Sequence, residues 1–478
     1  MKIETPHSAG TLLPQVGRLF AVACVSITCV MNACSQQSFA QNSDSGAGGR
    51  QDGLTTKSLI GDSVSLANRD YPEIESAIQR FRNGDMQGSL DYLNQAKEKY
   101  PKLPPTDITM AKMQLAYRNA KAVRYLLERT VLKHPDDPEA YLLLADQAFV
   151  SGRTTEADAL FAVVDPLVQN FDENKRRKDN FAIRVIAGRS AVAERRQQWE
   201  KARELLNEWI AVDPESAAAH QRLGVTEFRL KKSREALEEF KKARELNPEG
   251  VAHPFVILGQ LFSQDGDKEN ARKAYEKAYA EDKSDVKVAQ AYAIWLIQED
   301  ELDKAQEVAS TLREQSPDSV AALLLDGIVA QMQGNTERAE QTLTKVLSID
   351  PSNETATNIL ALLLIESDDA ADRERALRYA QVNAELYEKS VQANITLGWV
   401  LFNLERSAEA NAALQKGARV GQLQSDSAYL VSKIMSTQES QRAKAIQTLE
   451  QVLNQKKGLF LFRRDAEKLL KELKGENG

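Results

Sequence analysis

The residue types that most often perform chemistry in proteins are few in this chain, and their spacing does not favour a reactive site. The three cysteines all lie near the start of the chain, at Cys24, Cys29 and Cys34. The body of the protein therefore has no cysteine nucleophile, disulfide framework or cysteine metal site. The four histidines are His7, His134, His220 and His253, and they lack the spacing of metal ligands.

The known catalytic motifs are also missing from the sequence. It contains no GxxxxGK[ST] phosphate loop, no GxSxG nucleophile elbow and no HExxH zinc motif. The acidic pairs 136–137 and 368–369 fall in expected turns between helices, where capping and the helix dipole favour carboxylates. The basic run at 175–178 could contact phosphate or an acidic partner, or form a solvated helix face. We therefore expect no enzyme activity, no cofactor, no metal and no small-molecule substrate.

Composition points to a helical protein with a substantial core. Hydrophobic residues make up 42% of the 478 residues and aromatic residues only 6%, so alanine and leucine must provide most of the packing. Both are strong helix formers. The net charge of −7 argues against nucleic-acid binding.

The first 40 residues have the pattern of an export signal. Lys2 and Arg18 precede the apolar run 19–31, which is too short for a transmembrane helix and suits the core of a signal peptide. Cleavage could follow the small-x-small site at 38–40. Alternatively, residues 31–34 resemble a bacterial lipobox, which would make Cys34 a lipidated N-terminus and provide the only membrane contact. Met31 and Asn32 depart from the usual lipobox residues.

Residues 41–70 are rich in Ser, Gly, Asn and Asp, especially over 41–67. Such a segment cannot bury enough apolar surface to order itself, so we expect a flexible linker. If the N-terminus is not a signal peptide, the protein would instead be cytoplasmic.

The rest of the chain repeats itself. Residues 217–251 and 252–283 align directly, with Leu223-Gly224 matching Leu258-Gly259 and Ala236 matching Ala271. Prolines recur 34 residues apart, from 101 to 135, from 214 to 248 and from 317 to 351. A repeat of this length indicates pairs of helices that must stack on one another to bury their apolar faces.

This pattern resembles the tetratricopeptide repeat. The resemblance rests on small and aromatic residues at fixed offsets, among them Ala145, Gly152, Ala157 and Phe161; Gly224, Ala236, Phe240, Ala243 and Pro248; Gly259, Gly266, Ala271 and Tyr275; and Gly327, Gly334, Ala339 and Leu343. It implies an all-α, right-handed superhelical solenoid of helix-turn-helix units. We expect ten or eleven repeats.

The expected domains follow from these observations. We predict a signal peptide at 1–40, the linker at 41–70, an N-terminal sub-array at 71–178, a main array at 179–455 and a capping helix with tail at 456–478. Around 165–180 the chain is longer than one repeat allows, so we expect extended helices or an irregular turn there.

The resemblance also implies where a partner would bind. In this family the first helix of each repeat lines a concave groove. The corresponding residues here include Phe228, Arg229, Gln260, Gln290, Gln331, Asn358, Trp399, Phe402 and Asn403. Amides can hydrogen-bond the backbone of a peptide, and an aromatic ring can anchor its side chains. Trp399 and Phe402 could instead pack within their own repeat or against the next one.

The sequence thus favours a non-catalytic scaffold of the bacterial cell envelope that binds a protein or an extended peptide and assists assembly or secretion machinery. Two alternatives stay open at this point. One is a cytoplasmic adaptor, and the other is a carbohydrate-binding or exopolysaccharide-export accessory protein.

Overall fold

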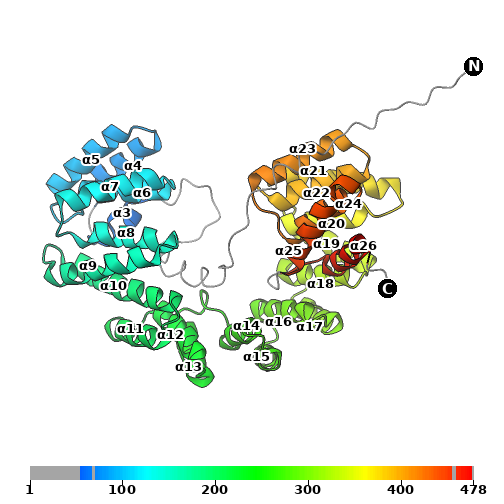
Figure 1. Ribbon diagram of the computed structural model, residues 1–478, viewed down its shortest axis with the longest axis horizontal. Coiled ribbons are helices and arrows are strands. Elements are labelled where there is room, and N and C mark those ends of the chain that lie inside the picture. Colours follow the sequence, from blue (N-terminus) through cyan, green and yellow to red (C-terminus); the bar gives the residue numbers. More distant parts are fainter. Residues whose placement is uncertain (1–53, 67–69, 455–458, 476–478) are drawn as a thin grey trace, which may run out of the picture. The chain divides into compact units, whose positions relative to one another are not determined.

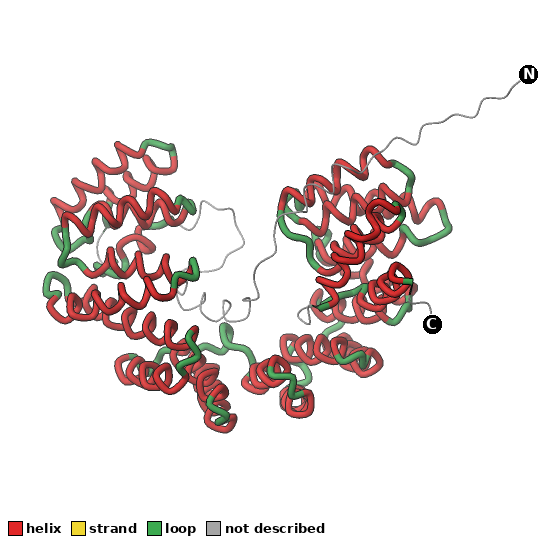
Figure 2. Tube along the Cα trace, viewed as in Figure 1, coloured by secondary structure: helices red, strands yellow, loops and turns green. Residues whose placement is uncertain are grey.

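The computed structural model describes residues 54–66, 70–454 and 459–475. Within these ranges the fold is all-α, with helices α3 to α26 and no strand (Figures 1 and 2). The expected all-α solenoid of stacked helix pairs is confirmed. None of the described helices is long and apolar enough to cross a membrane. The expected signal peptide and Cys34 lie outside the described residues.

The helices from α4 onward form consecutive hairpins. The first five are α4–α5 (Pro72–Arg82, Met86–Lys99), α6–α7 (Thr106–Ala116, Ala120–Lys133), α8–α9 (Pro138–Val150, Thr154–Asn170), α10–α11 (Lys175–Arg195, Trp199–Val212) and α12–α13 (Ala217–Arg229, Ser233–Leu246). The next are α14–α15 (Pro254–Gln264, Lys268–Glu281), α16–α17 (Val286–Gln298, Leu302–Gln315) and α18–α19 (Val320–Met332, Thr336–Ile349). The last are α20–α21 (Glu354–Leu364, Ala370–Leu386), α22–α23 (Val391–Asn403, Ser407–Val420) and α24–α25 (Ser425–Ser436, Arg442–Leu453).

The described residues fall into two compact units, which we call the N unit (54–261) and the C unit (262–475). The division lies within α14. The sequence instead placed a boundary between 178 and 179, which falls inside the continuous helix α10. The expected extended helices are present, since α9 has 17 residues and α10 has 21.

The small and aromatic residues at the fixed positions of the repeat explain how close the paired helices lie. A Cβ added to Gly224 of α12 would stand 2.5 Å from Cε1 of Phe240 in α13. Ala236 and Ala243 are fully buried beside it. The small residue thus makes room for the aromatic ring of the second helix, and any larger side chain would overpack this contact.

Nine of the eleven described hairpins have a residue with a left-handed backbone in the inner turn, and α20–α21 and α24–α25 do not. Gly152 occupies that position between α8 and α9 with φ 77°. The hairpin α6–α7 lacks the glycine, and Arg118 adopts φ 56° in its place. A non-glycine residue pays about 1–2 kcal/mol for this conformation, so stacking against neighbouring hairpins must compensate.

The chain ends in a short helix, α26 (Arg463–Lys474), which contacts α24 and α25. Its Ala466 is fully buried. Leu469, Leu470 and Leu473 are half-buried against the core of the last hairpins. This helix covers apolar surface at the end of the C unit, as a capping helix must.

The linker prediction is wrong for residues 54–66. Thr56–Ile60 form the short helix α3, which contacts α4 and α6. Leu54, Leu59 and Ile60 are 4%, 1% and 0% exposed. The few apolar residues at the end of this polar stretch find a buried site on the first hairpins, and their burial orders the segment.

Candidate peptide-binding faces

The first helices of consecutive hairpins form one surface of each unit, which we call its helix-A face. In the N unit this face is formed by α4, α6, α8, α10 and α12. In the C unit it is formed by α16, α18, α20, α22 and α24. In both units the helix-A face holds a segment from outside the eleven hairpins: residues 54–66 in the N unit and residues from 459 onward in the C unit.

In the N unit, side chains of the A helices and of the residue that caps α10 donate hydrogen bonds to backbone carbonyls of segment 54–66. The bonds are Arg82 Nη2 to Leu54 at 3.0 Å, Lys112 Nζ to Leu59 at 3.2 Å, Arg176 Nε to Gly61 at 3.1 Å, Asn180 Nδ2 to Asp62 at 3.0 Å and Asn174 Nδ2 to Ser63 at 2.7 Å. Because these contacts reach the backbone, they hold a segment largely independently of its side chains.

A buried cluster of charges lies beneath the same segment. Nη2 of Arg177 lies 2.8 Å from Asp137 and 2.7 Å from Glu139, and Lys112 Nζ lies 2.6 Å from Glu139. Lys112 also binds Asp62 of the segment at 2.9 Å. The segment therefore contributes one carboxylate to an ion network that ties α6, α8 and α10 together.

Burial and charge compete in setting the pKa values of this cluster. Desolvation opposes the charged form of Glu139, but the charges of Lys112 and Arg177 outweigh it and lower its pKa to about 2. For Asp137 desolvation is the larger effect, and its pKa is raised despite the nearby Arg177. The fully buried Glu139 stays ionised, and its negative charge depends on both cations remaining in place.

The residues of the basic run at 175–178 differ in solvent exposure. Lys175 is solvated, with 86% of its side chain exposed, whereas the Arg177 side chain is 1% exposed. Arg177 packs against the rings of both Phe171 and Phe181, with its guanidinium carbon 5.1 Å from each ring centre. Interpreting the whole run as a solvated face is wrong for Arg177. Its ion-pair partners, Asp137 and Glu139, lie about 40 residues earlier in the sequence, and nothing in the basic run itself indicates this pairing.

In the C unit, the segment that leads into α26 crosses the helix-A face. Phe460 is 5% exposed. Leu461 contacts the buried cluster of α18, α19 and α20 that contains Leu323 and Leu360. Phe462 stacks on Tyr429 of α24 with ring centres 5.3 Å apart. At the far end, Arg464 Nη2 lies 2.5 Å from Asp300 Oδ1, just beyond α16.

One carboxylate holds the backbone of this second segment. Asp426 Oδ1, in the first turn of α24, accepts a hydrogen bond from the backbone N–H of Phe462 at 3.3 Å. Desolvation raises the pKa of Asp426 to about 6, although hydrogen bonds from the N–H groups of Phe462 and Leu461 act in the opposite direction. Covering α24 with the terminal segment is a direct cause of that burial.

The expected groove residues near the unit boundary are only partly accessible. Phe228 is 2% exposed, so its expected role as a surface contact is wrong. Arg229 is half-buried, with its guanidinium carbon 5.7 Å from the centre of the Phe228 ring. Gln260 is exposed. A large aromatic side chain on an A helix gains more by burial between helices than by facing water.

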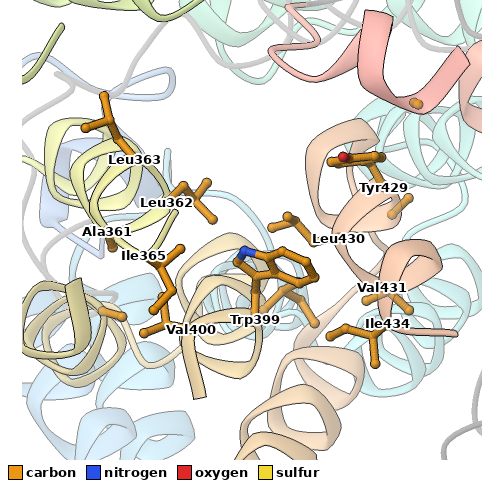
Figure 3. Close-up of a cluster of buried hydrophobic side chains, with 14 of the residues drawn as sticks. Ala361, Leu362, Leu363, Ile365, Trp399, Val400, Tyr429, Leu430, Val431 and Ile434 are labelled. Carbon is orange, nitrogen blue, oxygen red and sulfur yellow. The ribbon is translucent and has the colours of Figure 1, made fainter. Parts of the chain in front are cut away.

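Two more expected contacts belong to the core of the C unit. Trp399 is 4% exposed and lies between Leu362 of α20 and Leu430 of α24 (Figure 3). Asn358 is 6% exposed, and its Oδ1 accepts a hydrogen bond from Asn383 of α21 at 3.4 Å. Neither residue is available to a partner in this arrangement: Trp399 packs in the core, which was the alternative to a partner contact, and the expected contact at Asn358 is wrong. Stacking of adjacent A helices leaves only a narrow strip of each one uncovered.

The remaining expected residues are half-buried in the C unit. Phe402 stacks beside Trp399 with ring centres 6.1 Å apart, and Asn403 Nδ2 donates to the carbonyl of Trp399 at 2.8 Å. Gln290 of α16 donates to the carbonyl of Ala321 at the start of α18, at 3.5 Å. Gln331 lies near the end of α18. Among the expected groove residues of the C unit, Gln290 and Gln331 are the ones whose side-chain amides stay at the surface.

The described residues contain no group of three or more His, Cys, Asp or Glu side chains that could hold a metal ion. The site chemistry visible in both units is therefore hydrogen bonding to backbone, apolar contact and ion pairing. These are the interactions by which a protein holds a peptide segment.

Comparison with known proteins agrees with this organisation. Tetratricopeptide repeat models match residues 118–167, 188–251 and 263–326. No curated protein matches the chain.

Several solved structures resemble the fold. Yeast Tom70 is 15% identical, with 85% of this chain and 95% of that chain covered and a TM-score of 0.37. A tetratricopeptide repeat protein from Parabacteroides merdae ATCC 43184 is 17% identical, with 54% and 99% covered and a TM-score of 0.41. PilW, a type IV pilus biogenesis factor, is 17% identical, with 41% and 90% covered and a TM-score of 0.32. Such distant likenesses carry no argument about function. The matching repeat models and the succession of stacked hairpins identify the chain as a tetratricopeptide repeat protein.

Proposed function

We propose that this protein is a non-catalytic scaffold that binds a segment of a partner protein on its helix-A faces, and that it acts in the bacterial cell envelope after export. Tetratricopeptide repeats support a role in protein–protein interaction in general. The finer proposal depends on how the helix-A faces bind two segments of the same chain that lie outside the hairpins.

The observation that carries the proposal is the way segment 54–66 is bound. Five donor side chains, four on A helices and one at the start of α10, reach backbone carbonyls of that segment, and two adjacent apolar side chains, Leu59 and Ile60, are fully buried. A surface that orders a short segment in this way has the chemistry needed to order a segment of another protein.

The part of the helix-A face on α16 and α18 is our candidate for the partner. Gln290, Ile294 and Gln331 are half-buried there, so they retain some accessible surface. The mixture of amide and apolar groups suits an extended peptide, whose backbone needs hydrogen-bond partners and whose side chains need apolar contacts.

Site-specific photocrosslinking in cells tests this assignment. A crosslinking amino acid at Gln290 or Gln331 is expected to trap one reproducible partner. The matched control is the exposed Glu307 on α17, a second helix, which is expected to trap none. Equal labelling from all three positions would overturn the proposed binding face.

Export to the envelope is supported by the sequence at residues 1–40, where basic residues precede an apolar run. The intact mass of the mature protein, purified from fractionated bacteria, tests it. A start at Cys34 with added acyl mass is expected for a lipoprotein, and a start at Gln41 for a soluble periplasmic protein. An unprocessed Met1 in the cytosol would contradict export and leave a cytoplasmic adaptor.

A further inference from the structure

The C-terminal segment crosses the helix-A face of the C unit with its first residues, and its helix α26 then packs on α24 and α25. Its first part is apolar and aromatic. Leu461 contacts the cluster of α18 to α20, and Phe462 stacks on Tyr429. Its second part is the amphipathic helix α26, which directs Ala466 and three leucines toward the core and its charged residues outward.

Helix α26 buries a smaller share of its residues than the hairpins beneath it, although Arg442 of α25 donates hydrogen bonds to the carbonyl of Leu473 at 3.0 and 2.7 Å. Of the residues in α26 only Ala466 is buried, whereas α24 buries eight of its 12 residues. The ion pair between Arg464 and Asp300 leaves 60% and 73% of the two side chains exposed, and such exposed pairs contribute little to stability. Local regions with few buried contacts open more readily than the core.

The segment packs against an apolar cluster formed by other hairpins, through Phe462, Leu469, Leu470 and Leu473. Leu362 and Leu363 of α20 and Tyr429 and Leu430 of α24 belong to this cluster, on either side of Trp399 (Figure 3). These side chains project from helices that already pair with their own second helices. Opening of the segment would therefore uncover an apolar surface on a framework that is otherwise complete.

The charges also match across this contact. Between residues 463 and 474 the segment has five basic and three acidic side chains. Arg464 faces Asp300, and Lys474 Nζ lies 2.9 Å from Glu450 of α25. Asp426 adds a half-buried carboxylate under the backbone of Phe462. Carboxylates at these three points beside an apolar surface favour basic side chains in the amphipathic segment that covers it.

We propose that the helix-A face of α18 to α24 is a binding site for a partner segment in which two aromatic residues, spaced as in Phe-x-Phe, precede a basic amphipathic helix. Residues 459–474 occupy this site in the free protein and must be displaced by the partner. The proposal deepens the proposed scaffold function by naming the class of partner, and it rests on that function.

A labelled synthetic peptide with the sequence of residues 459–475 is the probe, added to the full chain. The wild type is expected to bind it weakly, because its own segment competes. The double variant Phe462→Ala/Arg464→Glu weakens the internal segment, so the apparent affinity for the peptide is expected to rise by about tenfold or more. Adding Tyr429→Ala to that variant removes the stacking partner and is expected to abolish the gain.

Lys468→Ala is the matched control, because it removes an exposed basic side chain from the same helix. It is expected to leave peptide affinity unchanged. An unchanged affinity in the folded double variant would overturn the proposal.

Hydrogen exchange of the wild-type chain gives an independent answer if the double variant fails to fold. Amides of α26 are expected to exchange at least about tenfold faster than those of α22, through local opening. If the amides of α26 exchanged at the same rate as those of α22, the segment would belong to the core and the proposal would be overturned. If the peptide does not bind while photocrosslinks at Gln290 and Gln331 persist, this inference fails and the scaffold function stands.

Discussion

The side-chain amide of Asn174 donates a hydrogen bond to the carbonyl oxygen of Ser63 at 2.7 Å, across 111 residues of sequence. The same amide group lies 3.0 Å from the carbonyl of Lys102, and its oxygen accepts the N–H of Arg177 at 3.2 Å, which caps α10. One residue thus joins the start of a helix, a loop between hairpins and the segment 54–66.

Replacing Asn174 with alanine is expected to release this segment. The change removes a helix cap, worth about 1 kcal/mol, and leaves buried carbonyls without their donor, which costs about 1–3 kcal/mol. Hydrogen exchange of the amides in 54–66 should accelerate more than exchange in α12. The matched control is Asn119→Ala, which removes the cap of α7 but does not touch the segment. If both variants accelerate the hydrogen exchange of residues 54–66 equally, the hydrogen bond to Ser63 has no special role in holding the segment.

Substitution of Arg177 tests the buried ion cluster. Arg177→Met leaves Asp137 and Glu139 buried without one of their cations, and we expect a loss of about 3–5 kcal/mol in the free energy of local unfolding. Hydrogen exchange of α8 and α10 measures it. Lys175→Ala removes a neighbouring basic residue whose ion pair with Asp179 is exposed, so its effect should stay below about 0.5 kcal/mol. A small effect of Arg177→Met would show that the cluster does not need this charge.

The raised pKa of Asp426 predicts a specific pH dependence of the C unit. Its pKa is about 6 in the folded protein and near 3.8 in an unfolded chain. Between these values the folded state binds more protons, so the free energy of unfolding falls as pH rises from about 4 through 6. The full effect of this one group is on the order of 3 kcal/mol.

Urea unfolding of wild type and Asp426→Asn at pH 4 and pH 7 measures this effect. Asparagine cannot ionise here, and its side-chain oxygen can still accept the N–H of Phe462. The stability of wild type relative to the variant should therefore decrease from pH 4 to pH 7. A relative stability that does not change with pH would contradict the prediction.

Gly224 tests how tightly the helices of one hairpin are packed. In Gly224→Ala the new Cβ would lie 2.5 Å from the Phe240 ring, so the ring or a helix must shift. We expect a loss of about 1–3 kcal/mol in thermal or urea unfolding. The control Gly421→Ala places a Cβ 3.3 Å from Val391 Cγ2, on backbone with φ 177° that any residue adopts, and should cost far less. Equal losses would exclude the ring contact as the cause.

Much of the architecture could be predicted from local pattern alone. The small residues at Gly224, Ala236 and Ala271 predicted repeats at 217–251 and 252–283, and these ranges contain the hairpins α12–α13 and α14–α15. Helix periodicity and the close approach of two helices depend on neighbouring residues, and such information is present in a short stretch of sequence. The caps of α8 and α21, Asp137 and Asp369, were predictable for the same reason.

The candidate site was much less predictable. Trp399, Asn358 and Phe228 have the spacing of surface residues on a first helix, yet all three are buried. Arg177 lies in a basic run that resembles a solvated face, yet its side chain is almost fully enclosed. The burial of a side chain depends on which other hairpins stack beside it, and no single repeat contains that information.

By itself the sequence determined that the protein is a tetratricopeptide repeat array of stacked helix pairs, because each pair is specified by contacts between residues close in the chain. Only the tertiary structure decided that segment 54–66 and residues 459–474 lie on the helix-A faces. Those contacts join residues more than 100 positions apart, such as Asn174 with Ser63 and Arg464 with Asp300. They depend on the three-dimensional positions of many hairpins at once, which is why composition alone suggested a flexible linker and a simple cap.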